Sequence, residues 1–225
     1  MIVVTGASSG IGKAICERLI SKKLKIIGVS RNINKVKFKS FKCDVSSYSD
    51  VKNLVKFLKS KKIKVDGLIN AAGLASMNLA VTTPKKVVEE IINVNLIGSI
   101  YLSQLLLPLM IRNKKGSIIN FSTIAVNMAL KGESIYIASK AGVEGFSRSL
   151  AREVSDFNIK VNCIAPGPIK TNLLKGISDN QINKIVSNQL IKKKFTTNDV
   201  CDVVEMLLDK KSESLTGQVF HIGGV

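Results

Sequence analysis

A glycine-rich segment near the start of the chain has the residue types of a phosphate-binding turn. Thr5–Gly12 reads Thr-Gly-Ala-Ser-Ser-Gly-Ile-Gly and separates a short apolar run from an amphipathic one. Glycines there let the backbone turn tightly and approach a pyrophosphate, whose charge is attracted by free N–H groups and by the positive end of a helix. It is not a Walker motif, because Ala7 stands where that motif needs glycine and Ala14 stands where it needs Ser or Thr. We predict a pyrophosphate-binding turn formed by Gly6, Ser8, Ser9, Gly10, Ile11 and Gly12; the alternative is a glycine-rich turn without a ligand.

A tyrosine and a lysine later in the chain are spaced to act together. Tyr136 and Lys140 are four residues apart, so on a helix they share one face. An ammonium group beside a phenol favours the phenolate and brings the phenol pKa, ordinarily about 10, toward neutrality, as general acid–base catalysis requires. Taken alone, the pair is more commonly an exposed tyrosine beside a lysine whose stem lies along the surface.

The elements that must position these residues alternate along the chain. Short apolar runs followed by amphipathic segments are typical of a parallel sheet covered by helices on both faces. The predicted fold class is α/β: a doubly wound Rossmann-type three-layer sandwich with a parallel sheet of about seven strands, in a single domain of residues 1–225. The predicted strands are 2–5, 25–30, 39–43, 67–70, 117–122, 160–165 and 218–222.

Helices are predicted between these strands from apolar stripes and capping residues. One follows Asp50 as a cap, another follows Thr196 or Thr197, a long one runs from Pro84 to about Met110 with the proline in its first turn, and another covers about 135–154. Only thirteen residues separate Ser30 from Asp44. The crossover helix after the second strand is therefore expected to be missing or shortened to a turn.

The net charge of +18, from 34 Lys and Arg against 16 Asp and Glu, raises the question of a nucleic-acid partner. The basic residues are scattered as pairs and triplets, and only five are arginine, the residue suited to planar bidentate recognition. We therefore expect no nucleic-acid partner and only a mild preference for anionic substrates.

The remaining composition excludes several other classes. Four cysteines lie far apart with no CxxC pair, which predicts reduced, mostly buried thiols and no metal site. No stretch approaches the ~18 uninterrupted apolar residues of a spanning helix, so no membrane partner is expected. The chain reaches its glycine turn by Gly6, which leaves no room for a signal peptide and predicts a cytoplasmic protein.

Taken together, these motifs resemble the short-chain dehydrogenase/reductase family. The Thr-Gly-x3-Gly-Ile-Gly turn and the later Tyr-x3-Lys pair are joined by an Asn-Ala-Ala-Gly element at 70–73, where Ala71 replaces the family's second asparagine. Asp44-Val45 and the Ala165–Thr171 segment also match family elements, and the similarity runs from Ile2 to Gly224.

The resemblance implies a role for each matching position. Asp44 and Val45 would contact adenine, Lys140 would hold the nicotinamide ribose and lower the pKa of Tyr136, and Tyr136 would exchange a proton with the substrate oxygen. Asn95 would kink its helix and position a water that passes protons to Lys140. The further cofactor contacts implied are Asn70, Ala71, Gly73, Pro166, Gly167, Ile169 and Thr171.

One catalytic position departs from the family pattern. Relatives carry a serine thirteen residues before the tyrosine, and this chain has Thr123 there, with Ser122 one residue earlier. Neighbours on a strand face opposite sides, so only one hydroxyl can polarise the substrate carbonyl. Spacing favours Thr123, and a small shift at the strand end would present Ser122 instead.

The cofactor is predicted from the end of the second strand. An acidic residue there would bind the ribose 2′-OH of NAD, whereas an arginine accommodates a 2′-phosphate. Ser30 is followed by Arg31 and Asn32, with no Asp or Glu, which favours NADP(H) over NAD(H). The other interpretation of Arg31 is a solvated loop cation.

The predicted activity is hydride transfer between NADP(H) and a carbonyl or secondary alcohol. Segments 139–142, 149–153, 161–167 and 215–218 resemble 3-oxoacyl-[acyl-carrier-protein] reductases. This implies a small-molecule or carrier-bound carbonyl substrate, with residues 171–194 as a lid. A keto sugar or sugar nucleotide is the alternative substrate, and a non-catalytic NADP(H)-binding regulator is the alternative class. Family resemblance also implies a homo-oligomer, a dimer or tetramer built on the helices near 95–110 and 135–154.

Overall fold

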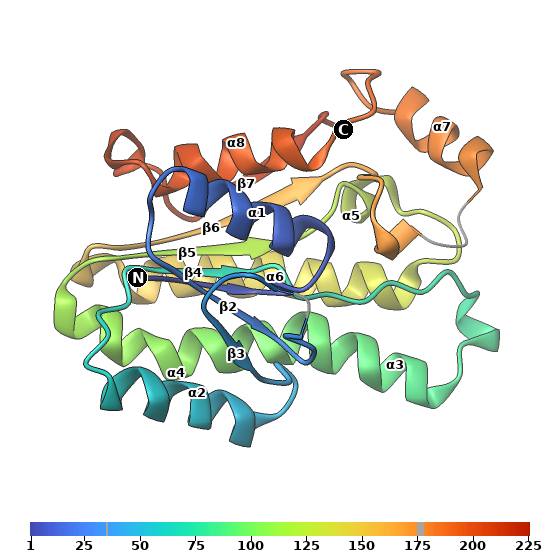
Figure 1. The fold of residues 1–225 in the computed structure, drawn as a ribbon. Helices are drawn as coiled ribbons and strands as arrows, with labels where there is room; N and C mark the ends of the chain where they lie inside the picture. Colours follow the sequence, from blue (N-terminus) through green and yellow to red (C-terminus); the bar gives the residue numbers. More distant parts are fainter. Residues whose placement is uncertain (35, 175–177) are drawn as a thin grey trace.

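Seven parallel strands form one sheet with helices on both faces (Figure 1). The computed structural model describes residues 1–34, 36–174 and 178–225. The strand order is β3-β2-β1-β4-β5-β6-β7, so the winding direction reverses between β1 and β4, where sheets of this kind bind ligands at the strands' carboxyl ends. The strands are β1 (Ile2–Thr5), β2 (Ile26–Ser30), β3 (Ser40–Lys42), β4 (Gly67–Asn70), β5 (Gly116–Phe121), β6 (Ile159–Pro166) and β7 (Val219–Ile222).

The helices form the two outer layers. In Figure 1, α1 (Gly10–Ser21) and α8 (Thr197–Leu208) cover one face of the sheet, and α2 (Tyr48–Ser60), α4 (Gly98–Asn113) and α6 (Ser134–Glu153) cover the other. The other helical segments are α3 (Lys85–Ile92), a π-helical turn (Asn93–Ile97), α5 (Ala125–Met128), α7 (Asp179–Ser187) and the 3₁₀ turns Ala80–Thr82, Ser155–Phe157, Asn172–Leu174 and Lys210–Ser212.

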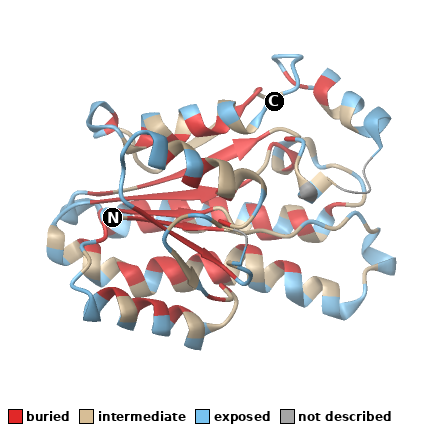
Figure 2. Cartoon of the chain, in the orientation of Figure 1, coloured by how far each residue is buried: buried red, intermediate tan, exposed pale blue. Residues whose placement is uncertain are grey.

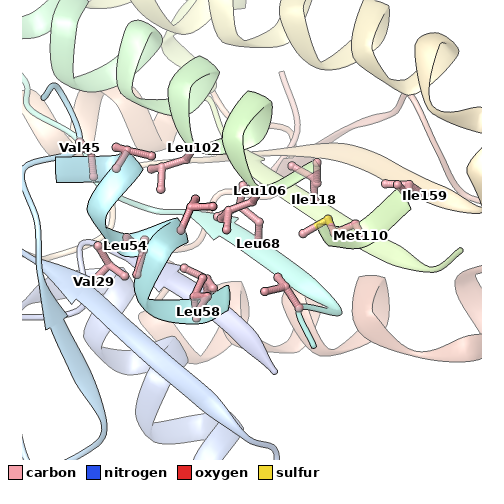
Figure 3. Close-up of a cluster of buried hydrophobic side chains, with 14 of the residues drawn as sticks. Val29, Val45, Leu54, Leu58, Leu68, Leu102, Leu106, Met110, Ile118 and Ile159 are labelled. Atoms are coloured by element: carbon pink, nitrogen blue, oxygen red, sulfur yellow. The ribbon is translucent and has the colours of Figure 1, made fainter. Parts of the chain in front are cut away.

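The pleat of the strands divides the apolar residues into two cores. Val3 packs with α2, α4 and α6, whereas its neighbours Ile2 and Val4 pack with α1 and α8. In the first core, Leu58 of α2 and Leu106 of α4 lie with Leu68 and Ile118 of the sheet, and other members of this core are drawn beside them in Figure 3. Figure 2 shows the central strands buried on both sides. This burial explains why the strands appear in the sequence as continuous apolar runs.

The predicted sheet is confirmed, with every predicted strand boundary within one residue of the observed one. The shortened crossover is confirmed too, because the described residues between β2 and β3 contain no helix. Phe38 covers the sheet there instead. A Cβ added to Gly28 of β2 would lie 2.5 Å from the Phe38 ring, so glycine makes room for this side chain.

Three details of the helices differ from prediction. The cap of α2 is Ser47, whose Oγ accepts the N–H of Asp50, while the Asp50 carboxylate accepts the N–H of Asp44 at 2.9 Å. Pro84 is the N-cap residue of α3, one position before the first turn. The predicted long helix is interrupted by the π-helical turn. For α8, the predicted alternatives resolve to Thr196, which forms a reciprocal capping box with Asp199.

The helical run Lys85–Asn113 is the one helix in the described part of the chain that is long and apolar enough to cross a membrane by length and composition. Its α4 portion packs Leu102, Leu106 and Met110 into the first core, which accounts for much of its apolar character. All four cysteines are buried and free.

Candidate active site

A cavity of about 690 Å³ opens at the carboxyl ends of the strands, near β1 and β4, where the winding direction of the sheet reverses. Its walls come from the glycine turn, the ends of β2 and β3, the segment after β4, the end of β5, the start of α6 and the segment after β6. All but three of the predicted site residues line it. The exceptions are Gly12, Asn70 and Asn95.

The glycine turn has backbone geometry that only glycine adopts easily. Gly6 and Gly10 have positive φ angles of 66° and 55°, and a Cβ on Gly6 would lie 2.7 Å from the carbonyl oxygen of Ala71. Gly12 serves packing: its Cβ would lie 2.5 Å from the Gly6 oxygen, so the first turn of α1 rests directly on the loop. The glycines thus hold α1 in place and leave the loop surface open.

The N-terminus of α1 faces this open surface without a side-chain cap. Ser9 is the N-cap residue, and among the described residues no side chain caps the helix at that end. Free N–H groups and the helix dipole therefore point to the cavity, as a phosphate group requires. A nicotinamide dinucleotide fits this wall, because the glycine loop and the uncapped start of α1 line the cavity and would offer N–H groups to its pyrophosphate.

Tyr136 and Lys140 lie on α6 with their side chains buried at the cavity wall. The Lys140 Nζ donates to the carbonyl oxygen of Phe121 at 2.8 Å and lies 5.9 Å from the centre of the Tyr136 ring. The Thr123 hydroxyl lies close enough to that of Tyr136 to lower the Tyr136 pKa slightly. Two hydroxyls and one ammonium group therefore converge at one end of the cavity.

The electrostatics of this group correct one expectation. Burial raises the pKa of Tyr136, and the negative charge of Glu133 raises it further. The Thr123 hydroxyl lowers this pKa, but by less than the other two raise it. Burial lowers the pKa of Lys140 to about 8. The prediction that Lys140 brings the Tyr136 pKa down was wrong for this structure, because the ammonium group is held at the Phe121 carbonyl and burial dominates.

The two candidate hydroxyls after β5 point in different directions. Ser122 Oγ donates to the buried carboxylate of Glu144 at 2.6 Å. Thr123 Oγ1 accepts the N–H of Ala125 at 3.2 Å and faces Tyr136. The alternation of side chains therefore turns Thr123, and not Ser122, toward Tyr136.

Asn95 lies in the π-helical turn and is completely buried. Its Oδ1 accepts the N–H of Leu74 at 2.8 Å, and its Nδ2 donates to the Leu74 carbonyl and to Ser139 Oγ. A Cβ added to Gly73 would lie 3.4 Å from Asn95 Oδ1 and 3.6 Å from Lys140 Nζ. Asn95 thus fixes the segment that touches Lys140, and its amide is fully used in doing so.

Asn70 also lies away from the cavity, in contrast to its predicted cofactor contact. Its Nδ2 donates to Asn120 Oδ1 at 2.8 Å inside the sheet, and Asn120 in turn donates to Ser147 of α6. This buried chain of amides ties β4 and β5 to α6. Only the residues after Asn70 reach the cavity.

The far end of the cavity carries the predicted adenosine contacts. Arg31 and Asn32 are exposed at its rim, and Ser30 Oγ donates to the Asn32 carbonyl at 2.8 Å. Asp44 Oδ1 accepts the N–H and hydroxyl of Ser46. Among the described residues Arg31 forms no ion pair, so its guanidinium is free to meet an anion.

Sequence reasoning missed Glu133 and the apolar part of the wall. Glu133 lies three residues before Tyr136, so helical spacing alone would place both on one side of α6. The part of the apolar wall that was missed includes Leu74, Met77 and Leu130, whereas Leu173, Leu174 and Ile185 belong to the predicted lid. Part of the predicted lid, residues 175–177, lies outside the described residues. No cluster of three potential metal ligands occurs in the part of the chain that the structure describes.

Comparison with known proteins identifies this arrangement. The family model described as short chain dehydrogenase matches residues 1–182. The chain belongs to this family. It is 35% identical to a 3-oxoacyl-[acyl-carrier-protein] reductase of Buchnera aphidicola subsp. Schizaphis graminum, over 99% of this chain and 95% of the relative. It is 33% identical to carbonyl reductase family member 4 of Xenopus laevis, over 98% of this chain and 95% of that relative.

Solved structures agree with the family. A 4-hydroxyisoleucine dehydrogenase complexed with NADH superposes with a TM-score of 0.92 at 29% identity, covering 99% of this chain and 97% of that one. The aldohexose dehydrogenase of Thermoplasma acidophilum superposes with a TM-score of 0.90 at 28% identity, covering 99% of this chain and 92% of that one. This short-chain dehydrogenase is therefore an oxidoreductase of the family that uses a nicotinamide cofactor.

Proposed function

We propose that this protein is an NADP(H)-dependent reductase of a carbonyl group, acting reversibly on the corresponding secondary alcohol. The observation that carries this proposal is the convergence of Tyr136, Thr123 and Lys140 at one end of a cavity whose other end is the open glycine turn. A pyrophosphate at the turn would leave the rest of the cavity for the nicotinamide and the substrate.

The bound cofactor would supply the hydride, which adds to the carbonyl carbon. Tyr136 would give its proton to the carbonyl oxygen as negative charge develops there, so that the product is a neutral alcohol. Thr123 would donate a hydrogen bond to the same oxygen, an electrostatic contribution that grows as the oxygen becomes an alkoxide. Lys140, anchored on the Phe121 carbonyl, would hold the ribose hydroxyls and later support reprotonation of Tyr136.

The choice of NADP(H) over NAD(H) is supported by the rim of the cavity. Arg31 is exposed at the end of β2 and no acidic residue stands beside it, so a 2′-phosphate would find a cation and a ribose 2′-OH would find no carboxylate. Because one structural relative, 4-hydroxyisoleucine dehydrogenase, is complexed with NADH, this choice needs its own measurement.

Two substrate classes follow from different observations. The relatives named 3-oxoacyl-[acyl-carrier-protein] reductases, together with the net charge of +18, favour a 3-oxoacyl thioester on an acidic carrier protein. The polar Glu133 in the wall beside Tyr136 favours a hydroxylated ketone such as a keto sugar, and the relative of known structure named aldohexose dehydrogenase acts by name on a sugar.

The test is NADPH oxidation with a panel of 3-oxoacyl thioesters and keto sugars, using the wild type, Tyr136→Phe and a matched control. Tyr136→Phe should bind NADPH with unchanged affinity and lose about 10²- to 10⁴-fold in turnover, since the proton donor is removed. Tyr101→Phe, in a tyrosine that stacks on Tyr48 away from the cavity, should leave turnover unchanged. Cofactor binding without turnover on any substrate would instead support a non-catalytic regulator.

The cofactor choice is tested in the same assay. Arg31→Ala should raise the KM for NADPH and leave that for NADH nearly unchanged, because only the 2′-phosphate loses a partner. A wild type that uses NADH as efficiently as NADPH, or an Arg31→Ala variant that affects both equally, would contradict the proposal.

A further inference from the structure

Glu133 puts a carboxylate inside the cavity one helical turn before Tyr136. The residue is the N-cap of α6 and is only 8% exposed. Its backbone is occupied, since its N–H donates to the Leu130 carbonyl and its carbonyl accepts from Ile137. Its side chain does not cap the helix, and within the described part of the chain its carboxylate has neither a hydrogen-bond donor nor a cation as partner.

A second glutamate on the same helix provides the contrast. Glu144 is buried to a similar degree, but it accepts the Ser122 hydroxyl at 2.6 Å and lies 3.6 Å from the Arg148 guanidinium. Those contacts provide the Glu144 carboxylate with a hydrogen-bond donor and a cation from the protein itself. Glu133 has no such contacts among the described residues, so no hydrogen bond or ion pair from them offsets the cost of burying its carboxylate.

The Glu133 carboxylate is open to the cavity and not sealed in the core. In the described part of the chain, the side-chain atoms that are both sealed and unpartnered belong to Asn70 and Gln189. Burial nevertheless raises the pKa of Glu133, which measures the cost of holding a charge there. A buried acceptor without a partner is unfavourable, and a molecule that enters the cavity with a donor would relieve this cost.

We propose that Glu133 is a specificity residue that accepts a hydrogen bond from a hydroxyl or ammonium group close to the substrate carbonyl. The inference rests on the proposed function, because it takes Tyr136 as the group that meets the carbonyl oxygen. Side chains three apart on a helix are about 5–6 Å apart at their Cβ atoms, so the donor belongs on a carbon adjacent to the carbonyl or one further. A ketone with only an alkyl chain there would leave the carboxylate unpartnered.

Three ketones of the same size test this inference: 3-pentanone, 1-hydroxy-2-butanone and 1-amino-2-butanone. They differ only in a methyl, hydroxyl or ammonium group at one position. Intrinsic reactivity is removed by comparing each ketone's kcat/KM relative to 3-pentanone between variants. Glu133→Leu should lower both relative values at least about tenfold, since a site that loses its acceptor no longer distinguishes donors.

Glu133→Gln distinguishes the two kinds of donor, the hydroxyl and the ammonium group. The amide retains an acceptor oxygen and loses the charge, so it should keep most of the preference for the hydroxyketone and lose that for the aminoketone. Glu144→Gln is the matched control, and should change all three rates by one common factor. Equal relative values in the wild type and Glu133→Leu would overturn the inference.

A binding measurement keeps this result separate from the proposed function. If no ketone is reduced, the proposed function fails, and calorimetric titration of the NADP(H) complex with 1,2-butanediol and 3-pentanol still tests Glu133. The diol should bind more tightly than 3-pentanol to the wild type, and Glu133→Leu should abolish this difference. Equal affinity of the wild type for the two alcohols would overturn the inference.

Discussion

Tyr136 lies in surroundings that oppose its ionisation. Its side chain is buried, Glu133 adds negative charge nearby, and the Lys140 ammonium group is held at the Phe121 carbonyl. The phenol therefore keeps its proton at neutral pH. A protonated phenol is the general acid that reduction of a ketone requires, so these surroundings suit the reductive direction.

The charge of Lys140 gives the reaction a pH limit. Burial lowers its pKa to about 8, so the ammonium form is present below that pH and is lost above it. Because the proposed role of Lys140 needs the charged form, kcat/KM for ketone reduction should be level up to about pH 8 and then fall about tenfold per pH unit. Lys140→Arg, whose side chain stays charged, should be slower but should lack this fall. A wild-type profile level to pH 10 would contradict the prediction.

Helical spacing predicted that Tyr136 and Lys140 share a face, and the family resemblance added their roles and favoured Thr123 over Ser122. The direction of the Tyr136 pKa could not be predicted this way, since it depends on burial and on Glu133, which a Tyr-x3-Lys pattern does not include. Asn70 and Asn95 show the same limit. Family resemblance suggested roles for them, but the partners of their amides are set by tertiary packing.

At the scale of elements, the backbone at the end of β5 determines whether the Ser122 or the Thr123 hydroxyl faces Tyr136. Successive side chains face opposite sides, and the bond from Ser122 to Glu144 of α6 fixes the register of the strand end. Thr123 is thereby turned to Tyr136. The bond between Ser122 and Glu144 thus ties the end of β5 to α6 beside the cavity.

This arrangement predicts unequal effects of four substitutions. Thr123→Ala should lower kcat about 10²- to 10³-fold, as expected when a hydrogen-bond donor to an oxyanion is removed, and Thr123→Ser should restore most of it. Ser122→Ala should retain most activity and lower stability by about 1–3 kcal/mol, because the buried Glu144 loses its donor. Adding Glu144→Gln to Ser122→Ala should recover part of that loss. Denaturant unfolding and initial rates measure both effects, and a larger loss of kcat in Ser122→Ala than in Thr123→Ala would reverse the assignment.

The sequence predicted the strands closely and the helix ends less well. Buried parallel strands are continuous apolar runs between polar turns, so their limits are visible in composition. The start of α2 was missed because Asp50 and Ser47 are both good capping residues, and only the structure shows that the Ser47 hydroxyl is the acceptor. The π-helical turn at Asn95 coincides with side-chain bonds from Asn95 to Leu74 and Ser139, which are distant in the sequence and so leave no local pattern.

For the whole molecule, the outer surface of α4 and α6 is unlike that of the other helices. Only 39% of the most apolar 18-residue window of the α3–α4 run is buried within one chain. On α6, Ala138, Ala141 and Gly145 are exposed, and a Cβ added to Gly145 would meet no atom within 4 Å. Small residues beside half-exposed apolar ones let two helices approach closely, which supports the family-based proposal of a homo-oligomer.

The oligomer should therefore depend on this surface and on salt. Ala141→Arg should lower the particle mass measured by light scattering from a multiple of 24.4 kDa toward that of one chain, because the guanidinium would be buried between copies. Ser60→Arg, on the exposed end of α2, is the matched control and should leave the mass unchanged. Each copy carries a charge of +18, so like-charge repulsion opposes assembly and raising the salt from about 0.01 to 0.15 M should tighten it, as the Debye length falls from about 30 to 8 Å. A wild type of 24.4 kDa at both salt concentrations would contradict the prediction, and the apolar surface of α4 would then need another occupant.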